Sequence, residues 1–106
     1  VKWADEGKLP TLQRLIERGV HAPQCLVPYP TITPPNWTTI ATGAWPATHG
    51  ITDFEMFMPG RQLDDCYNAF NDRDVLAERL WTALEKVGKR SVTVNYSGGE
   101  PVSGRE

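Results

Sequence analysis

The chain has 106 residues, of which 40% are hydrophobic and 23% charged, and its formal net charge is -2. This length and composition are typical of about one globular domain. The slightly acidic charge disfavours binding to nucleic-acid polymers or acidic membrane surfaces. No apolar run approaches the length needed to span a bilayer, so we expect no membrane segment in this chain.

Two short helices are predicted before residue 20. Residues 1–7 have the pattern of the last turns of a helix that Gly7 ends. Residues 9–19 predict an amphipathic helix, with Thr11 as a possible N-cap and Gly19 at its end. Its apolar residues recur at helical spacing: Leu9, Leu12, Leu15 and Ile16.

An extended segment follows. Residues 21–27 are apolar-rich and lie between Gly19 and Pro28, which predicts a strand, although Pro23 confines its first part to an edge or a bulge. His21 is interpreted as a residue of this strand rather than a metal ligand. We expect Cys25 and Cys66 to be buried free thiols, with a disulfide or unrelated surface positions as the alternatives.

The stretch from Pro28 to Phe54 is the most distinctive part of the sequence. Two consecutive prolines, Pro34 and Pro35, fit only the first turn of a helix, where a missing N–H costs nothing. We therefore predict that a helix begins here with Thr33 as its N-cap and ends at Gly43. Its expected apolar face consists of Trp37, Ile40 and Ala41.

The second half predicts one further helix and one strand. Residues 51–71 mix apolar and polar residues around a turn at Pro59-Gly60, which indicates an irregular excursion. A helix is expected from Asp72 or Asp74 to Val87, followed by Gly88 and an alternating strand at residues 91–96. A helix, a glycine and then a strand is the usual step of a parallel α/β layer.

Thr33 and Asn36 form the candidate site. A hydroxyl at a helix N-terminus lies where an anion binds, and an amide three residues later lies on the same side of the first turn. Thr33 is then a possible nucleophile and Asn36 a possible donor to a phosphoryl oxygen, with Tyr29 lining the substrate pocket. The alternative is that Thr33 merely caps the helix. His49 is interpreted as a structural residue that holds the turn after this helix.

The motifs resemble the nucleophile region of the type I phosphodiesterase/nucleotide pyrophosphatase family of the alkaline phosphatase superfamily. The resemblance lies in Thr33-Pro34-Pro35-Asn36-Trp37, Thr42-Gly43, Pro46 and His49-Gly50-Ile51, preceded by Gly7 to Gly19. Sulfatases of this superfamily have a Cys or Ser nucleophile with an Arg four residues later. Trp37 occupies that place here, so the sulfatase branch is disfavoured.

The resemblance implies an α/β fold, an alkaline-phosphatase-like three-layer domain with a mostly parallel central sheet. It also implies a site with two divalent metal ions, usually zinc. Thr33 would attack phosphorus and contact the metal, and Asn36 would contact the phosphoryl oxygens. The implied substrate is a small phosphodiester or a nucleotide-type pyrophosphate.

The resemblance also implies that residues 1–106 are a partial domain. The family's first metal-binding aspartate belongs to a strand before the chain starts, and its other Asp and His ligands belong beyond Glu106. We therefore expect this chain alone to be inactive, as the nucleophile-bearing part of a hydrolase. The alternative is a non-catalytic, truncated domain that acts as a binding or interaction module. The compartment stays open, because a targeting signal would precede Val1.

Overall fold

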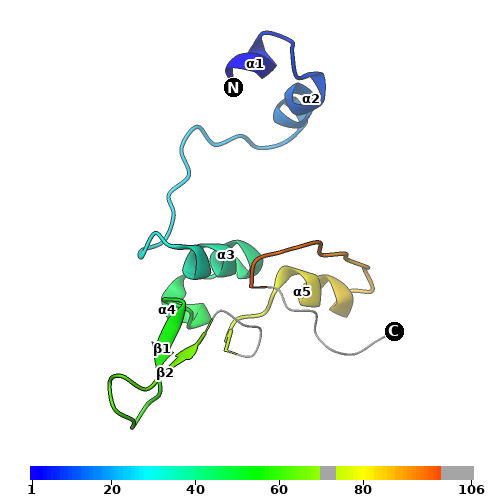
Figure 1. Ribbon diagram of the computed structural model, residues 1–106. Coiled ribbons are helices and arrows are strands. Elements are labelled where there is room, and N and C mark those ends of the chain that lie inside the picture. Colours follow the sequence, from blue (N-terminus) through cyan, green and yellow to red (C-terminus); the bar gives the residue numbers. More distant parts are fainter. Residues whose placement is uncertain (70–73, 99–106) are drawn as a thin grey trace.

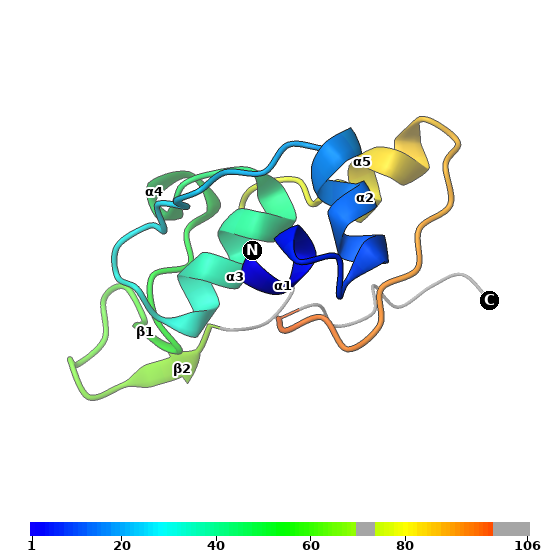
Figure 2. The same cartoon turned by 90° about the horizontal axis from the view of Figure 1, so that it is seen from above.

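The computed structural model describes residues 1–69 and 74–98. Its helices and strands follow the order α1 (Lys2–Asp5), α2 (Pro10–Arg18), α3 (Thr33–Thr42), α4 (Pro46–His49), β1 (Glu55–Phe57), β2 (Cys66–Asn68) and α5 (Leu80–Lys86). Two perpendicular views place α3 between the β1–β2 hairpin and α5 (Figure 1, Figure 2). The helix that contains the candidate nucleophile is therefore the centre of the arrangement.

The two N-terminal helices stand apart from this centre. Helices α1 and α2 pack on each other and are joined to α3 by an extended connection over residues 19–32 (Figure 1). The radius of gyration is 17.5 Å, whereas a compact domain of this length has about 13 Å. The helix predicted at residues 9–19 is confirmed, but Leu9 rather than Thr11 is its N-cap, because Pro10 already occupies the first helical position.

Helix α3 confirms the predicted helix and its end. Gly43 terminates it in the left-handed conformation, at φ 67°, and donates its N–H to the Thr39 carbonyl. The predicted N-cap was wrong by one position: Ile32 is the N-cap, and Thr33 is the first helical residue. The buried face also differs from the expected one, since it consists of Pro34, Pro35, Thr38 and Ala41.

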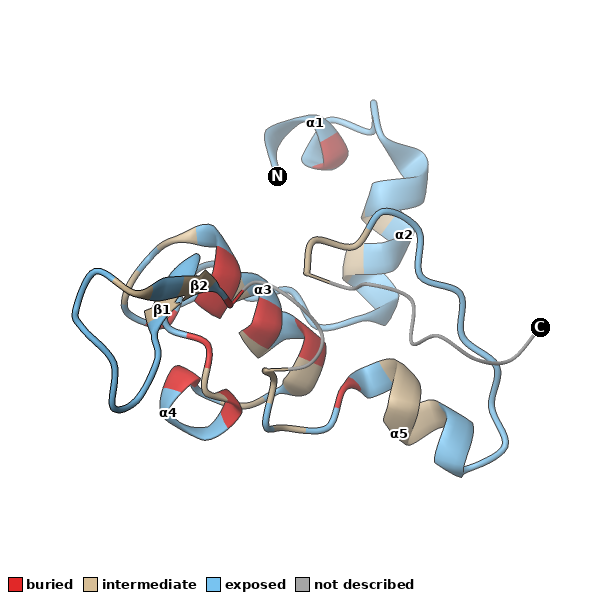
Figure 3. Cartoon of the chain, turned by 60° about the horizontal axis from the view of Figure 1, so that its bottom comes forward, coloured by how far each residue is buried: buried red, intermediate tan, exposed pale blue. Residues whose placement is uncertain are grey.

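Helix α4 was not predicted, although its signals are present in the sequence. Pro46 starts it, and Gly50 ends it in the left-handed conformation at φ 83°. The small core lies between α3, α4 and the turn after α4 (Figure 3). Its most completely buried large side chains are Ile51, His49, Pro34 and Pro35.

The segment predicted as an irregular excursion forms a hairpin. Strands β1 and β2 pair antiparallel, with Glu55 opposite Asn68 and Phe57 opposite Cys66. The turn predicted at Pro59-Gly60 is confirmed. The strands were missed because three residues are too few to show a clear alternation of apolar and polar side chains. The last residues of the predicted excursion, 70 and 71, lie outside the described residues.

The last predicted helix is shorter than expected. Helix α5 begins at Leu80 rather than at residue 74, because the Leu76 N–H donates to the His49 carbonyl (3.0 Å) and holds the preceding segment against α4. The alternative start at Asp72 lies outside the described part of the chain. Gly88 follows the helix at φ 72°, as predicted.

The two predicted strands of a parallel sheet do not form among the described residues. Residues 21–27 and 91–96 are without strand pairing, and the only sheet in residues 1–69 and 74–98 is the antiparallel hairpin. A strand needs a neighbour to accept and donate its ladder hydrogen bonds, and the described chain offers none to either segment. The observed architecture is therefore mixed helix with a small two-stranded sheet.

Tyr96 ties the C-terminal segment to α3. Its hydroxyl donates to the Trp37 carbonyl (2.8 Å), and its ring packs edge-on against Trp37 and Trp81 at centroid distances of 5.0 and 5.3 Å. The Arg79 guanidinium lies over the Trp81 ring, 5.6 Å from its centroid. Burial raises the pKa of the Tyr96 phenol, and nearby Arg79 opposes the shift.

Both cysteines are exposed, so the prediction of buried thiols was wrong. Cys25 lies in the extended connection before α3, and Cys66 opens β2. No other layer of the described chain covers either segment. Both thiols are therefore exposed, although free cysteines are usually buried in proteins. No helix in the described residues is long and apolar enough to cross a membrane.

Gly50 should tolerate a side chain less well than Gly43. Both have positive φ, which costs a non-glycine residue about 1–2 kcal/mol. A Cβ on Gly50 would also lie 3.1 Å from Leu76 Cδ1, whereas a Cβ on Gly43 would meet no atom within 4 Å. We expect Gly50→Ala to lower the free energy of unfolding more than Gly43→Ala, measured by urea denaturation. Equal losses would contradict this packing.

Candidate functional site

Thr33 is exposed at the first turn of α3. Its side chain makes no capping hydrogen bond and no other hydrogen bond within residues 1–69 and 74–98. The two prolines that follow have no N–H, and the Asn36 N–H already bonds the Ile32 carbonyl at 3.4 Å. The Thr33 hydroxyl is therefore free. The only backbone N–H groups left as donors in this first turn are those of Ile32 and Thr33.

Asn36 points back toward the loop before α3. Its Nδ2 donates to the Ile32 carbonyl at 2.7 Å and to the Pro30 carbonyl at 3.3 Å. Its Oδ1 is buried and has no hydrogen-bond donor among the described residues. The structure thus brings Thr33 and Asn36 together on one turn, but the amide hydrogens of Asn36 are already shared with two loop carbonyls.

Tyr29 lies just before this turn. Its side chain is 88% exposed, and the neighbouring Pro28 is buried. Tyr29 is therefore an open aromatic surface four residues before the start of α3. It packs against no ring of the described chain, so its face is free for a ligand.

His49 is a buried connector between α3 and α4. Its Nδ1 accepts the Ile51 N–H at 3.1 Å, which leaves the proton on Nε2 to be donated to Thr39 Oγ1, also at 3.1 Å. Its side chain is fully buried. Burial lowers the pKa of the imidazole, and the Pro35 carbonyl only partly offsets this effect. The structural role predicted for His49 is confirmed, and its partner Thr39 was missed.

Thr39 gave no local signal in the sequence. A threonine inside a helix commonly bonds a carbonyl of its own helix, as Thr42 Oγ1 does to the Thr38 carbonyl at 2.7 Å. The contact between Thr39 and His49 depends on the turn at Gly43 that folds α4 back on α3. Recognising it would have required α4 to be predicted first.

The described residues do not form a metal site by themselves. No group of three or more His, Cys, Asp or Glu side chains within them could hold an ion. Thr33 offers one hydroxyl oxygen, and a two-metal site needs several carboxylate or imidazole ligands. This part of the chain therefore does not fit a complete zinc site.

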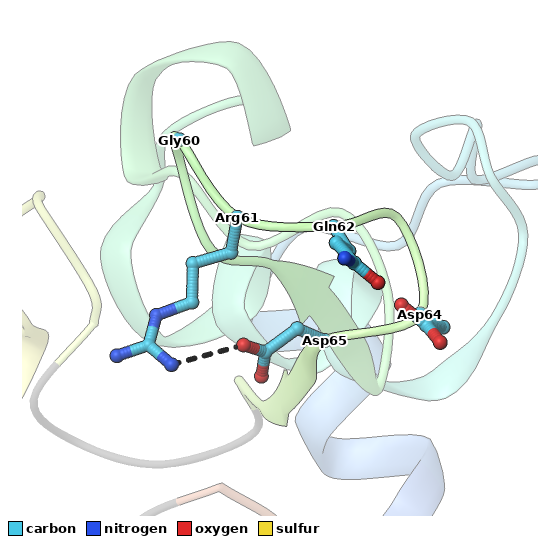
Figure 4. Close-up of a pocket in the computed structure, with 5 residues that line it drawn as sticks. All are labelled: Gly60, Arg61, Gln62, Asp64 and Asp65. Carbon is cyan, nitrogen blue, oxygen red and sulfur yellow. Dashed lines mark hydrogen bonds and ion pairs between the residues drawn. The ribbon is translucent and has the colours of Figure 1, made fainter.

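A surface hollow lies elsewhere, at the loop of the hairpin. It is lined by Gly60, Arg61, Gln62, Asp64 and Asp65, and Arg61 Nη1 pairs with Asp65 Oδ2 at 3.0 Å (Figure 4). Both side chains of the pair are well exposed, so the pair contributes little. The hollow contains none of the predicted site residues.

Comparisons with known proteins agree with the motifs. The family described as type I phosphodiesterase / nucleotide pyrophosphatase matches residues 2–105. An uncharacterized pyrophosphatase/phosphodiesterase of Schizosaccharomyces pombe is 34% identical over 99 residues, covering 89% of this chain and 20% of that protein. Human ectonucleotide pyrophosphatase/phosphodiesterase family member 1 is 30% identical over 97 residues, covering 89% of this chain and 10% of the relative.

More distant relatives carry the same kind of name. Venom phosphodiesterase 2 of Crotalus adamanteus is 28% identical over 98 residues, covering 90% of this chain and 12% of that protein. The chain thus spans between 10% and 20% of the length of these curated relatives. No solved structure matches the chain significantly.

His49 should make stability depend on pH. The native state disfavours the protonated imidazole, whereas the unfolded state binds a proton as the pH falls below about 6.5. The free energy of unfolding should therefore be fully retained above pH 6.5 and fall below it, with a limiting slope of about 1.4 kcal/mol per pH unit.

The matched variant is His49→Asn, which keeps an acceptor at the δ position for the Ile51 N–H but does not titrate. Urea unfolding at pH 7.5 and 5.5 should show a smaller loss for the variant than for the natural protein. A loss of the same size in both would show that His49 is not the group responsible.

Proposed function

Because the chain belongs to the type I phosphodiesterase/nucleotide pyrophosphatase family, we propose that the complete protein is a phosphodiester or pyrophosphate hydrolase in which Thr33 is the nucleophile. The observation that carries the proposal is the free, exposed hydroxyl of Thr33 at the start of α3. That hydroxyl stands at the positive end of a helix, where an approaching phosphoryl group is favoured.

The proposed reaction has two displacements at phosphorus. Thr33 Oγ1 attacks, a bond from this oxygen to phosphorus forms, and the bond from phosphorus to the leaving oxygen breaks. The hydroxyl proton passes through water to the leaving oxygen, so the leaving group departs as an alcohol or a phosphate. Water then hydrolyses the threonine ester, which releases the second product and restores the hydroxyl.

We propose that the complete protein also binds two divalent metal ions, zinc in the first instance, with Thr33 as the contact from this chain. Such ions lower the cost of forming an alkoxide and offset charge on the phosphoryl group. Their other ligands must come from outside the described residues, which hold no suitable cluster. The alkaline-phosphatase-like three-layer domain with a parallel central sheet is part of the same proposal.

The proposed substrate is a small phosphodiester or a nucleotide-type pyrophosphate. The relatives are named pyrophosphatases or phosphodiesterases, and the net charge of -2 gives no general attraction to a nucleic-acid polymer. Tyr29, four residues before Thr33 in the chain, offers an exposed ring for the leaving group. A contact between Asn36 and the phosphoryl oxygens requires its 3.3 Å bond to Pro30 to be exchanged.

Thr33→Ala should abolish hydrolysis without unfolding the protein. The side chain is exposed and makes no hydrogen bond in the described chain, so its loss should change stability by less than about 0.5 kcal/mol. Loss of a nucleophile should lower kcat for a p-nitrophenyl phosphodiester by at least about a thousandfold. The assay uses the complete protein with zinc present.

Thr33→Ser is the matched control, because it keeps the attacking oxygen and removes only a methyl group. It should retain measurable hydrolysis. Unchanged hydrolysis in Thr33→Ala would refute the nucleophile. A natural protein that hydrolyses no phosphodiester would favour the alternative function, a non-catalytic binding or interaction module.

A further inference from the structure

The start of α3 has few backbone donors. Pro28, Pro30, Pro34 and Pro35 all lie within eight residues and supply no N–H groups. The carbonyls of this segment therefore need donors from elsewhere. A side chain close to the turn is the obvious source.

Asn36 supplies that donor. Its Nδ2 bonds the Ile32 carbonyl at 2.7 Å, whereas the Asn36 N–H reaches the same carbonyl at only 3.4 Å. The shorter bond is the better one, because hydrogen bonds weaken beyond about 3.2 Å. The N-cap carbonyl of α3 is thus held more by a side chain than by the helix itself.

The same amide also reaches the carbonyl two residues further back. Its 3.3 Å bond to the Pro30 carbonyl ties residues 30 and 32 to a single group. The orientation of the amide follows from these contacts: with the amide reversed, Oδ1 would face the Ile32 carbonyl at the present 2.7 Å, an unfavourable pairing of two acceptors. Its buried Oδ1 gains no donor from the described residues, so the bonds from Nδ2 determine the orientation.

We infer that Asn36 is a positioning residue, which fixes the place of Thr33 at the start of α3 by holding the Ile32 and Pro30 carbonyls, and that it is not the donor to the phosphoryl group. Thr33 lies between Ile32 and Asn36, and its side chain makes no hydrogen bond within residues 1–69 and 74–98. The position from which its hydroxyl attacks is therefore set by the backbone that Asn36 holds. The inference rests on the proposed role of Thr33 as the nucleophile.

Helix α3 itself suggests the conservative substitution. Thr42 Oγ1 donates to the carbonyl four residues before it, at 2.7 Å. A serine at position 36 can make the same contact with the Ile32 carbonyl, since that carbonyl also lies four residues back. Asn36→Ser should therefore keep a side-chain hydrogen bond to the Ile32 carbonyl, whereas Asn36→Ala should lose it.

The test is a double-mutant cycle in the complete enzyme, with hydrolysis of a p-nitrophenyl phosphodiester and inhibition by inorganic phosphate as the two readouts. We expect Asn36→Ala to lower kcat by about 10- to 100-fold, because a misplaced nucleophile loses its attack geometry, with KM unchanged within about twofold. Asn36→Ser should restore kcat to within about threefold of the natural enzyme.

The phosphate inhibition constant separates positioning from direct contact. In the Thr33→Ala background, adding Asn36→Ala should leave this constant unchanged if Asn36 acts through Thr33. A rise of about tenfold would show a direct phosphoryl contact and overturn the inference. Should Asn36→Ala fail to fold, Asn36→Ser decides: near-natural kcat supports positioning, and a loss of both kcat and phosphate affinity overturns it.

Failure of the proposed function gives a different result. Unchanged kcat in Thr33→Ala alone would refute the nucleophile, whatever Asn36 does. A strong effect of Thr33→Ala combined with weaker phosphate binding in the double variant would refute only the positioning role.

Discussion

The geometry at the start of α3 depends on how a proline-rich turn satisfies its carbonyl groups. Prolines on both sides of Thr33 remove backbone donors, and the carboxamide of Asn36 replaces them with bonds of 2.7 and 3.3 Å to Ile32 and Pro30. The same prolines are buried at positions 34 and 35, where they form part of the small core. The exposed Thr33 hydroxyl thus lies between a carbonyl held by Asn36, that of Ile32, and two buried prolines.

The other end of α3 is held by His49. The imidazole connects Thr39 to the Ile51 amide, and the His49 carbonyl accepts the Leu76 N–H. These contacts join α3, α4 and the segment before α5 into one unit. Outside this unit several apolar side chains are exposed, such as those of Leu15 and Leu26. The chain covers at most 20% of the length of the relatives compared above. Its stable centre is the unit around α3.

The sequence predicted those elements whose ends are set by proline and glycine. Helix α3 between Ile32 and Gly43 is the example, since both signals act locally. The strands predicted at residues 21–27 and 91–96 need neighbouring strands for their hydrogen bonds. The described chain offers none to either segment, so the local pattern did not produce a strand. The roles of Thr39 and of the Asn36 amide depend on where carbonyls and rings meet after folding, which local spacing does not specify.

A threonine nucleophile must become covalently bonded to phosphorus during turnover. The most direct measurement is mass spectrometry of the complete protein, quenched in acid while it hydrolyses a p-nitrophenyl phosphodiester. If Thr33 is the nucleophile, a phosphoester adduct should form on Thr33 and be absent from Thr33→Ala. Continued turnover with no adduct on Thr33, or with an adduct on another residue, would contradict this role.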